Sequence, residues 1–152
     1  MSKPEFGKRS LAHIATLHPD LKIVLIELMN ETTRSSDDFA VICGLRNKED
    51  QEHAYATKKS NAPFPKSYHN GSYDEDGAWM SDVSDAFDAI PYPIEWPDKK
   101  TDSPHEYIRK MARIWKLAER IMTKAHELGI ELEWGGMFKS WFDGPHYQRV
   151  RK

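Results

Sequence analysis

The stretch SDAFDAIPYP, Ser84–Pro93, is largely apolar and contains two aspartates. It lies within residues 59–100, which are rich in Pro, Gly, Asn and Asp and should otherwise hold little regular structure. We therefore predict one strand in this region, at about Ala86–Ile90. Neighbouring side chains of a strand point to opposite faces, so Asp88 and Phe87 should point apart. One face of the strand is expected to pack, and the other to present a carboxylate.

Helices are predicted before and after this strand. Apolar residues at helical spacing indicate two short helices within residues 9–30, and Pro19 should open the second. Asn47 is expected to cap a third helix that runs to about Lys58. The strongest helical pattern begins at Ser103, in the capping-box sequence SPHE, and continues to Gly129.

Three other segments are typical of strands: Phe39–Cys43, Ile130–Trp134 and His146–Val150. Helices outside a small mixed or antiparallel sheet form an α+β fold. We expect this arrangement, with polar functional groups on adjacent strand ends and loops.

Composition limits the functional classes. The chain has 152 residues, and this length favours one domain over residues 1–152. A formal charge of −2 argues against binding to nucleic acid, and we expect the basic tail at Gln148–Lys152 to be solvated. The sequence contains no apolar run of signal-peptide or membrane-spanning length, so no membrane insertion is expected. Cys43 is the only cysteine, which excludes an intrachain disulfide and predicts a buried small hydrophobe.

Two histidines and an aspartate suggest a metal site. Catalytic zinc is commonly held by two imidazoles and one carboxylate, with a further position left for water. His69, Asp88 and His146 fit this stoichiometry. Asp143 lies three residues before His146, where its carboxylate could take a proton from that water. This combination is typical of a metallopeptidase.

Four blocks, in order, resemble the zinc-dependent D,D-peptidase and L-alanyl-D-glutamate peptidase family, particularly short phage endolysins. The resemblance covers nearly the whole chain. The blocks are DFAVICGLRNKEDQ (Asp38–Gln51), YATKKSNAPFPKSYHN (Tyr55–Asn70), SDAFDAIPYPIEW (Ser84–Trp96) and LEWGGMFKSWFDGPHYQ (Leu132–Gln148).

The resemblance implies a role for each candidate residue and a hedgehog/D,D-peptidase-like fold, with a small, mostly antiparallel sheet and flanking helices. It implies that Asp143 is the catalytic acid/base and that Arg46 is a cation that faces the substrate and assists catalysis. Ser67 would lie near the metal and bind substrate. Without the resemblance, a surface ion pair of Arg46 with Glu49 or Asp50 would be the simpler interpretation. The implied zinc ligands are His69, Asp88 and His146.

The chain departs from the family pattern in two places. Many members have six residues between the first histidine and the aspartate, whereas eighteen separate His69 from Asp88 here. An inserted loop explains this difference, although Asp82 and Asp85 compete with Asp88 as ligands. The loop is acidic and could hold calcium, but a solvated loop is the simpler interpretation. Met137 replaces an acidic residue common in relatives, which leaves substrate preference open.

The expected function is that of a phage-endolysin-like zinc metallopeptidase that cuts peptidoglycan stem peptides, with the L-alanyl-D-glutamate bond as the preferred site. The alternatives are a D,D-carboxypeptidase and a non-catalytic cell-wall-binding or phage structural module. The chain is expected to act as a monomer. The resemblance further implies that it stays in the host cytoplasm until a separate partner opens the membrane.

Overall fold

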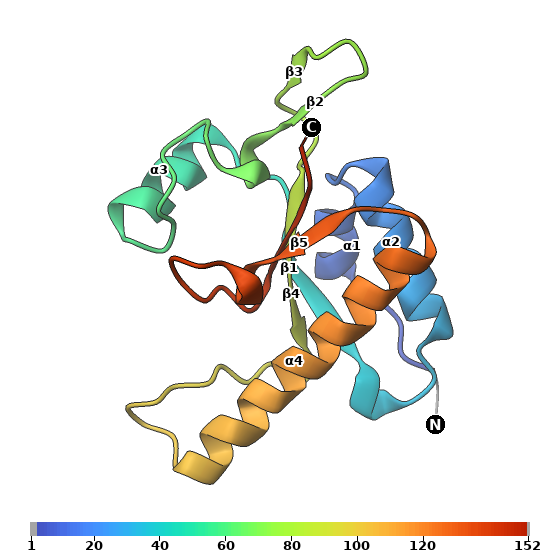
Figure 1. Ribbon diagram of the computed structural model, residues 1–152, viewed down its shortest axis with the longest axis vertical. Coiled ribbons are helices and arrows are strands. Elements are labelled where there is room, and N and C mark those ends of the chain that lie inside the picture. The colour runs from blue at the N-terminus through green and yellow to red at the C-terminus, as the bar shows by residue number, and fades with distance from the viewer. Residues whose placement is uncertain (1–2, 152) are drawn as a thin grey trace.

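The computed structural model describes residues 3–151, and its central element is a four-stranded antiparallel sheet in the order β1-β4-β6-β5 (Figure 1). All four strands lie where the sequence pattern predicts them, with ends shifted by no more than two residues. They are β1 (Phe39–Cys43), β4 (Ala86–Pro91), β5 (Leu132–Trp134) and β6 (His146–Arg149).

The helices also follow the sequence prediction. The Asn47 side chain caps the third helix by accepting a hydrogen bond from the amide of Asp50 at 2.8 Å. Ser103 accepts one from the amide of Glu106 at 3.2 Å and opens the longest helix. The α-helices are α1 (Lys8–Ile14), α2 (Pro19–Glu31), α3 (Lys48–Ala56) and α4 (Pro104–Glu127), and the short 3-10 helices are η1 (Ser35–Asp37), η2 (Tyr68–Asn70) and η3 (Gly135–Met137).

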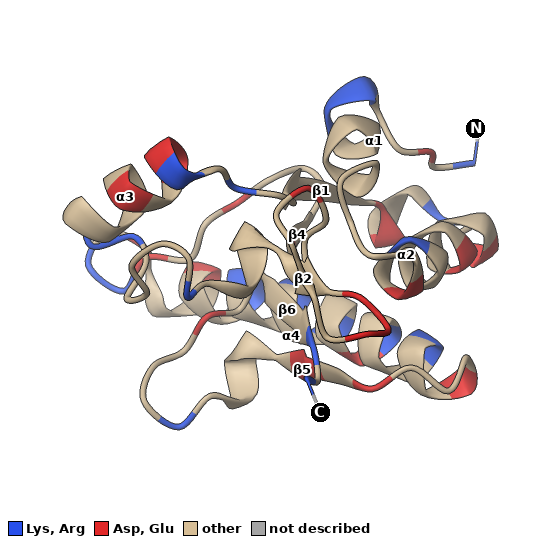
Figure 2. Ribbon diagram, turned by 90° about the horizontal axis from the view of Figure 1, so that it is seen from above, with Lys and Arg blue, Asp and Glu red and all other residues tan. Residues whose placement is uncertain are grey.

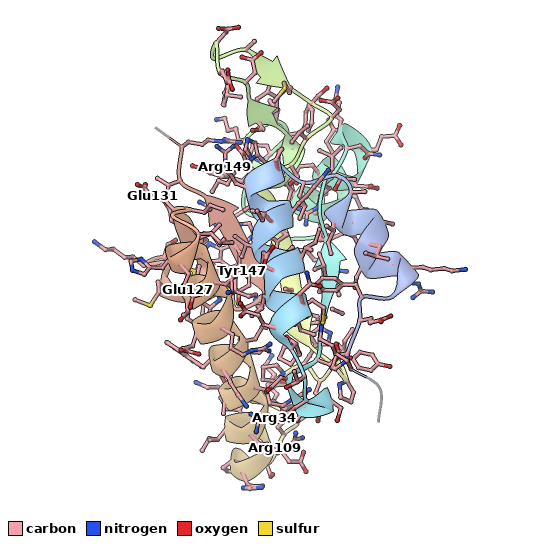
Figure 3. The ribbon with its side chains drawn as sticks, turned by 90° about the vertical axis from the view of Figure 1, so that its right-hand side faces the viewer. Arg34, Arg109, Glu127, Glu131, Tyr147 and Arg149 are labelled. Carbon is pink, nitrogen blue, oxygen red and sulfur yellow. The ribbon has the colours of Figure 1, made fainter. Side chains whose placement is uncertain are left out.

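The hydrophobic core lies between the sheet and the helices α1, α2 and α4, while α3 and the segment around η3 lie on the other side of the sheet (Figure 1). Phe87 of β4 and Tyr147 of β6 are fully buried and stack with ring centroids 5.0 Å apart. Tyr147 points toward the space between α2 and α4 (Figure 3). The next pair in register, Asp88 and His146, therefore faces away from the core.

The longer stretch between His69 and Asp88 contains a hairpin that no sequence pattern predicts. Its strands are β2 (Ser72–Tyr73) and β3 (Trp79–Met80), and it projects from one end of the sheet beside the C-terminus (Figure 1). Each strand has only two residues, too few for an alternating pattern to be visible in the sequence.

The expectation of a solvated basic tail is wrong for Arg149 and Arg151. Asp85 is buried and accepts hydrogen bonds from Arg149 Nη1 and Arg151 Nε, both at 2.9 Å. The Arg151 guanidinium also lies 3.8 Å from the centroid of the Tyr68 ring. A buried carboxylate requires a charged partner, and these two arginines supply it.

Among residues 3–151, no helix is both long enough and apolar enough to cross a membrane.

Candidate metal centre

His69, Asp88 and His146 converge on one point although they are far apart in the sequence. His69 Nε2 and His146 Nδ1 each lie 3.3 Å from Asp88 Oδ1. The two ring nitrogens lie 3.2 Å from each other. The three donor atoms thus form a nearly equilateral triangle.

The size of this triangle fits a zinc-type ion. Tetrahedral zinc with ligand distances of about 2.0–2.2 Å has ligand-to-ligand separations of about 3.3–3.6 Å. The observed separations of 3.2–3.3 Å lie at the lower end of that range. Two nitrogens and one carboxylate oxygen are also a common donor set of catalytic zinc sites. The three residues could therefore hold such an ion with room for a further ligand.

Local structure fixes His69 from two directions. Ser67 is the N-cap of η2, and its hydroxyl accepts a hydrogen bond from the His69 amide at 3.2 Å. On the imidazole, Nδ1 lies 2.8 Å from the carbonyl oxygen of Gly44, so Nδ1–H donates there and Nε2 is the nitrogen left to bind a metal ion once the ring is neutral. Metal-binding histidines commonly have such an outer partner.

His146 has a corresponding outer partner on its own strand. Its Nε2 lies 2.8 Å from Gln148 Oε1, because alternate residues of β6 share a face. The Gln148 amide then donates to Glu133 Oε2 at 3.1 Å, across the register pair of β5 and β6. This chain of contacts orients His146 so that Nδ1 faces Asp88.

The surroundings shift the pKa of Asp88 and the pKa of Asp143 in opposite directions. Burial acts to raise the pKa of Asp88, but the two imidazoles outweigh it and hold this pKa well below its usual range. Burial likewise acts to lower the pKa of His69, and the Asp88 charge overcomes it and raises this pKa to about 10. Burial, followed by the charge of Asp88, raises the pKa of Asp143. Asp88 is therefore suited to remain ionised, and Asp143 to exchange a proton.

Asp143 shares the cavity of the three donor residues. Its amide donates to the carbonyl oxygen of Gly135 at 3.0 Å, and its carbonyl oxygen accepts from the amide of His146 at 3.2 Å. A Cβ atom on Gly135 would collide with the backbone of Asp143, so the close approach requires glycine. The turn therefore holds Asp143 beside His146.

Arg46 also reaches the cavity, and Gln51 holds it there. Arg46 Nη1 donates to Gln51 Oε1 at 2.9 Å. Within residues 3–151, Arg46 has no ion pair with Glu49 or Asp50. Gln51 is fully buried and accepts a second hydrogen bond from Asn70 at 3.1 Å. Sequence reasoning missed this role, because a polar residue on a helix normally indicates an exposed position.

The cavity that joins these residues has a volume of about 630 Å³. Phe138 and Trp141 both line it, whereas Trp134 is buried and its indole donates to Gly144 O at 2.7 Å. No residue of the hairpin insertion lines it. The lining consists of Arg46, Lys59–Ala62, Lys66–His69, Asp88, Trp96, Phe138, Trp141, Asp143, Pro145, His146 and Gln148.

The competing ligand candidates lie elsewhere. Asp82 is exposed, and Asp85 is buried in its ion pairs with the C-terminal arginines. Cys43 is half-buried rather than buried, and its sulfur lies 3.7 Å from His69 Nδ1. Cys43, His69 and Asp88 offer donor atoms within 4.8 Å of one another. However, the cysteine faces the ring nitrogen that already donates to Gly44 O, so His146 completes the donor set better.

Two imidazoles and a carboxylate around one point, in a cavity with a second carboxyl of raised pKa, match a donor arrangement that is common in metal-dependent hydrolases. The family profile described as phage L-alanyl-D-glutamate peptidase matches residues 2–151, so the chain belongs to that family.

A solved structure supports the same fold. The L-Ala D-Glu endopeptidase ChiX of Serratia marcescens is 24% identical in sequence and superposes with a TM-score of 0.65, covering 97% of this chain and 92% of its own. The predicted α+β fold is thereby confirmed. No protein among the curated sequences matches the chain.

Proposed function

We propose that this chain hydrolyses the bond between L-alanine and D-glutamate in peptidoglycan stem peptides, with zinc held by His69, Asp88 and His146. The observation that carries the proposal is the convergence of these three donor atoms, 3.2–3.3 Å apart, in a cavity that also contains Asp143. Membership of the phage L-alanyl-D-glutamate peptidase family supports the choice of bond.

Asp143 is the proposed acid and base. A bound zinc ion would acidify a water molecule and polarise the scissile carbonyl group. A carboxylate oxygen of Asp143 takes the proton of the attacking water and then gives it to the amide nitrogen of the departing D-glutamate. The raised pKa of Asp143 favours both transfers, because the group holds the proton between the two steps.

Arg46 is the proposed substrate-facing cation. D-Glutamate in a stem peptide is linked through its γ-carboxyl group, so its α-carboxylate is free and lies next to the scissile nitrogen. The Arg46 guanidinium is close enough to Asp143 to lower the pKa of that carboxyl by its charge. An arginine that lines the same cavity as Asp143 can bind the α-carboxylate or stabilise the developing oxyanion. Ser67, which lines the same cavity, is placed to contact the substrate backbone.

Asp143→Ala and the isosteric Asp143→Asn test the proposed acid and base. Both variants should keep bound zinc and the folded state, and both should lose hydrolysis by about 10²- to 10⁴-fold. His146→Ala is the matched comparison, because it should lose zinc as well as activity. Cleavage of sacculi at the wild-type rate by Asp143→Ala would refute the role of Asp143.

Product analysis decides the substrate. Mass spectrometry of digested sacculi should find new amino-terminal D-glutamate. Released D-alanine would instead indicate a D,D-carboxypeptidase. Binding to sacculi with zinc but no released peptide would indicate a cell-wall-binding or phage structural module.

Assembly and location are further parts of the proposal. Action as a monomer is part of the proposal, and the meeting of His69, Asp88, Asp143 and His146 of a single chain in one cavity supports it. Sedimentation of the zinc-loaded protein tests this. Retention in the host cytoplasm until a separate partner opens the membrane is tested by fractionating host cells before lysis.

A further inference from the structure

One wall of the cavity carries two lysines that the mechanism above does not use. Lys59 and Lys66 line the same cavity as Arg46, and both are exposed. Within residues 3–151, no carboxylate forms an ion pair with either lysine. The cavity is therefore bordered by two available positive charges as well as the charge of Arg46.

The segment that carries these lysines is held in place at both ends. Gln51, which binds Arg46, also donates from Nε2 to the carbonyl oxygen of Ala62 at 2.6 Å and to the hydroxyl of Ser60 at 2.9 Å. The Lys59 amide donates to Ala54 O of α3 at 2.9 Å. One buried glutamine thus joins Arg46 to the segment that follows α3. In Figure 2, blue marks lysines where the chain leaves α3.

The far end of the segment is tied to the metal centre. The amide of Ser67, next to Lys66, donates to Asn70 Oδ1 at 3.1 Å within η2, which also contains His69. The amide of Lys66 donates to Pro63 O at 2.8 Å. Both lysines are therefore fixed at their backbones relative to the donor residues, while their side chains are free to reach a ligand.

We infer that Lys59 and Lys66 form a second carboxylate subsite, which binds the acid group of the stem residue that follows D-glutamate. This inference rests on the proposed function. Gln51 joins Arg46 to the segment that carries the lysines, so a peptide whose D-glutamate α-carboxylate binds Arg46 can extend toward them. The third stem residue is a diamino acid, and in diaminopimelate it carries a free carboxylate that lysine does not. Lysine ammonium groups bind such a carboxylate as mobile point charges with little demand on geometry.

Three stem peptides test this subsite: one with diaminopimelate in third position, one with its free carboxylate amidated, and one with lysine there. Wild-type enzyme should cleave the free-acid peptide with a kcat/KM about 3- to 10-fold above the other two, because two exposed ion pairs contribute only modestly. The double variant K59Q/K66Q should lose this preference, mainly through KM, since the contact is remote from the reacting atoms. The preference should also shrink in high salt.

Lys58→Gln is the matched control, because Lys58 is exposed and adjacent to Lys59 but does not line the cavity. It should retain the wild-type preference. Equal cleavage of the three peptides by wild-type enzyme, or an undiminished preference in the double variant, overturns the subsite and leaves the proposed function intact. If wild-type enzyme cleaves none of the peptides, the proposed function fails and the subsite fails with it.

Discussion

Replacing Gln148 by leucine tests whether the outer contacts of His146 contribute to metal binding. Gln148 Oε1 lies 2.8 Å from His146 Nε2, and leucine offers no acceptor in its place. The imidazole would then lose the contact that keeps Nδ1, rather than Nε2, directed at Asp88. Loss of such an outer partner typically weakens metal binding 10- to 100-fold.

The position of Gln148 favours the lower end of this 10- to 100-fold range. Its side chain is only half-buried, so water can replace part of the lost hydrogen bond. We therefore expect a loss near the lower limit, about tenfold in zinc Kd or about 1.4 kcal/mol. Glu133 is exposed and accepts a hydrogen bond from Gln148, so Glu133→Gln should change the Kd by no more than about threefold.

Competition with a chromogenic chelator measures these affinities directly, without substrate. Gln148→Glu is the control, because it restores an acceptor oxygen at the same place and should bind zinc at least as well as the leucine variant and close to wild type. His146→Ala shows how far the zinc affinity falls when one ligand is removed. If Gln148→Leu binds zinc as tightly as wild type while His146→Ala does not bind it, Gln148 has no part in orienting the ligand.

Three further changes probe the rest of the molecule. Asp85→Asn should lower the free energy of unfolding by about 2–4 kcal/mol in urea titrations, because it leaves two arginines without their buried partner, yet zinc content should stay normal. Asp88→Asn should lose zinc. If Asp85→Asn lost zinc and Asp88→Asn kept it, Asp85 would be the ligand. Gly44→Ala places a Cβ 2.6 Å from His13 O, so it should cost about 1–3 kcal/mol and also weaken zinc binding by displacing the carbonyl that orients His69. Gly7→Ala, with nothing within 4 Å, is its control and should shift stability by less than about 0.5 kcal/mol. Tyr147→Phe should raise the melting temperature, because the Tyr147 hydroxyl is buried without a hydrogen-bond partner in residues 3–151; a clear loss of stability would show that the hydroxyl has one.

Local patterns predicted most of the fold. The alternation around Asp88 correctly placed Phe87 in the core and the carboxylate on the opposite face, because burial of one face of a strand fixes its register. The capping sequence at Ser103 likewise gave the start of α4. Residue types and the family resemblance predict the three donor residues, and the structure brings their donor atoms together. Their role as zinc ligands stays a prediction.

Contacts between distant segments could not be predicted in the same way. Glu133 meets Gln148 only because β5 and β6 pair in one particular register, which no local pattern encodes. Gln51 looks like an ordinary exposed helix residue until the segment after α3 folds back over it. The two C-terminal arginines looked solvated because their partner, Asp85, lies more than sixty residues earlier.

The hairpin insertion leaves the fold and returns to it at nearly the same place. Tyr68 O accepts a hydrogen bond from the amide of Asp85 at 3.0 Å, and Arg151 donates to the carbonyl oxygen of Gly71 at 3.0 Å. The two ends of the excursion are therefore clamped together independently of what lies between them, and lengthening a loop whose ends are already joined costs little free energy. The length of the hairpin can therefore change without moving the residues that line the cavity. A foreign recognition peptide could be grafted at this position without rebuilding the catalytic cavity.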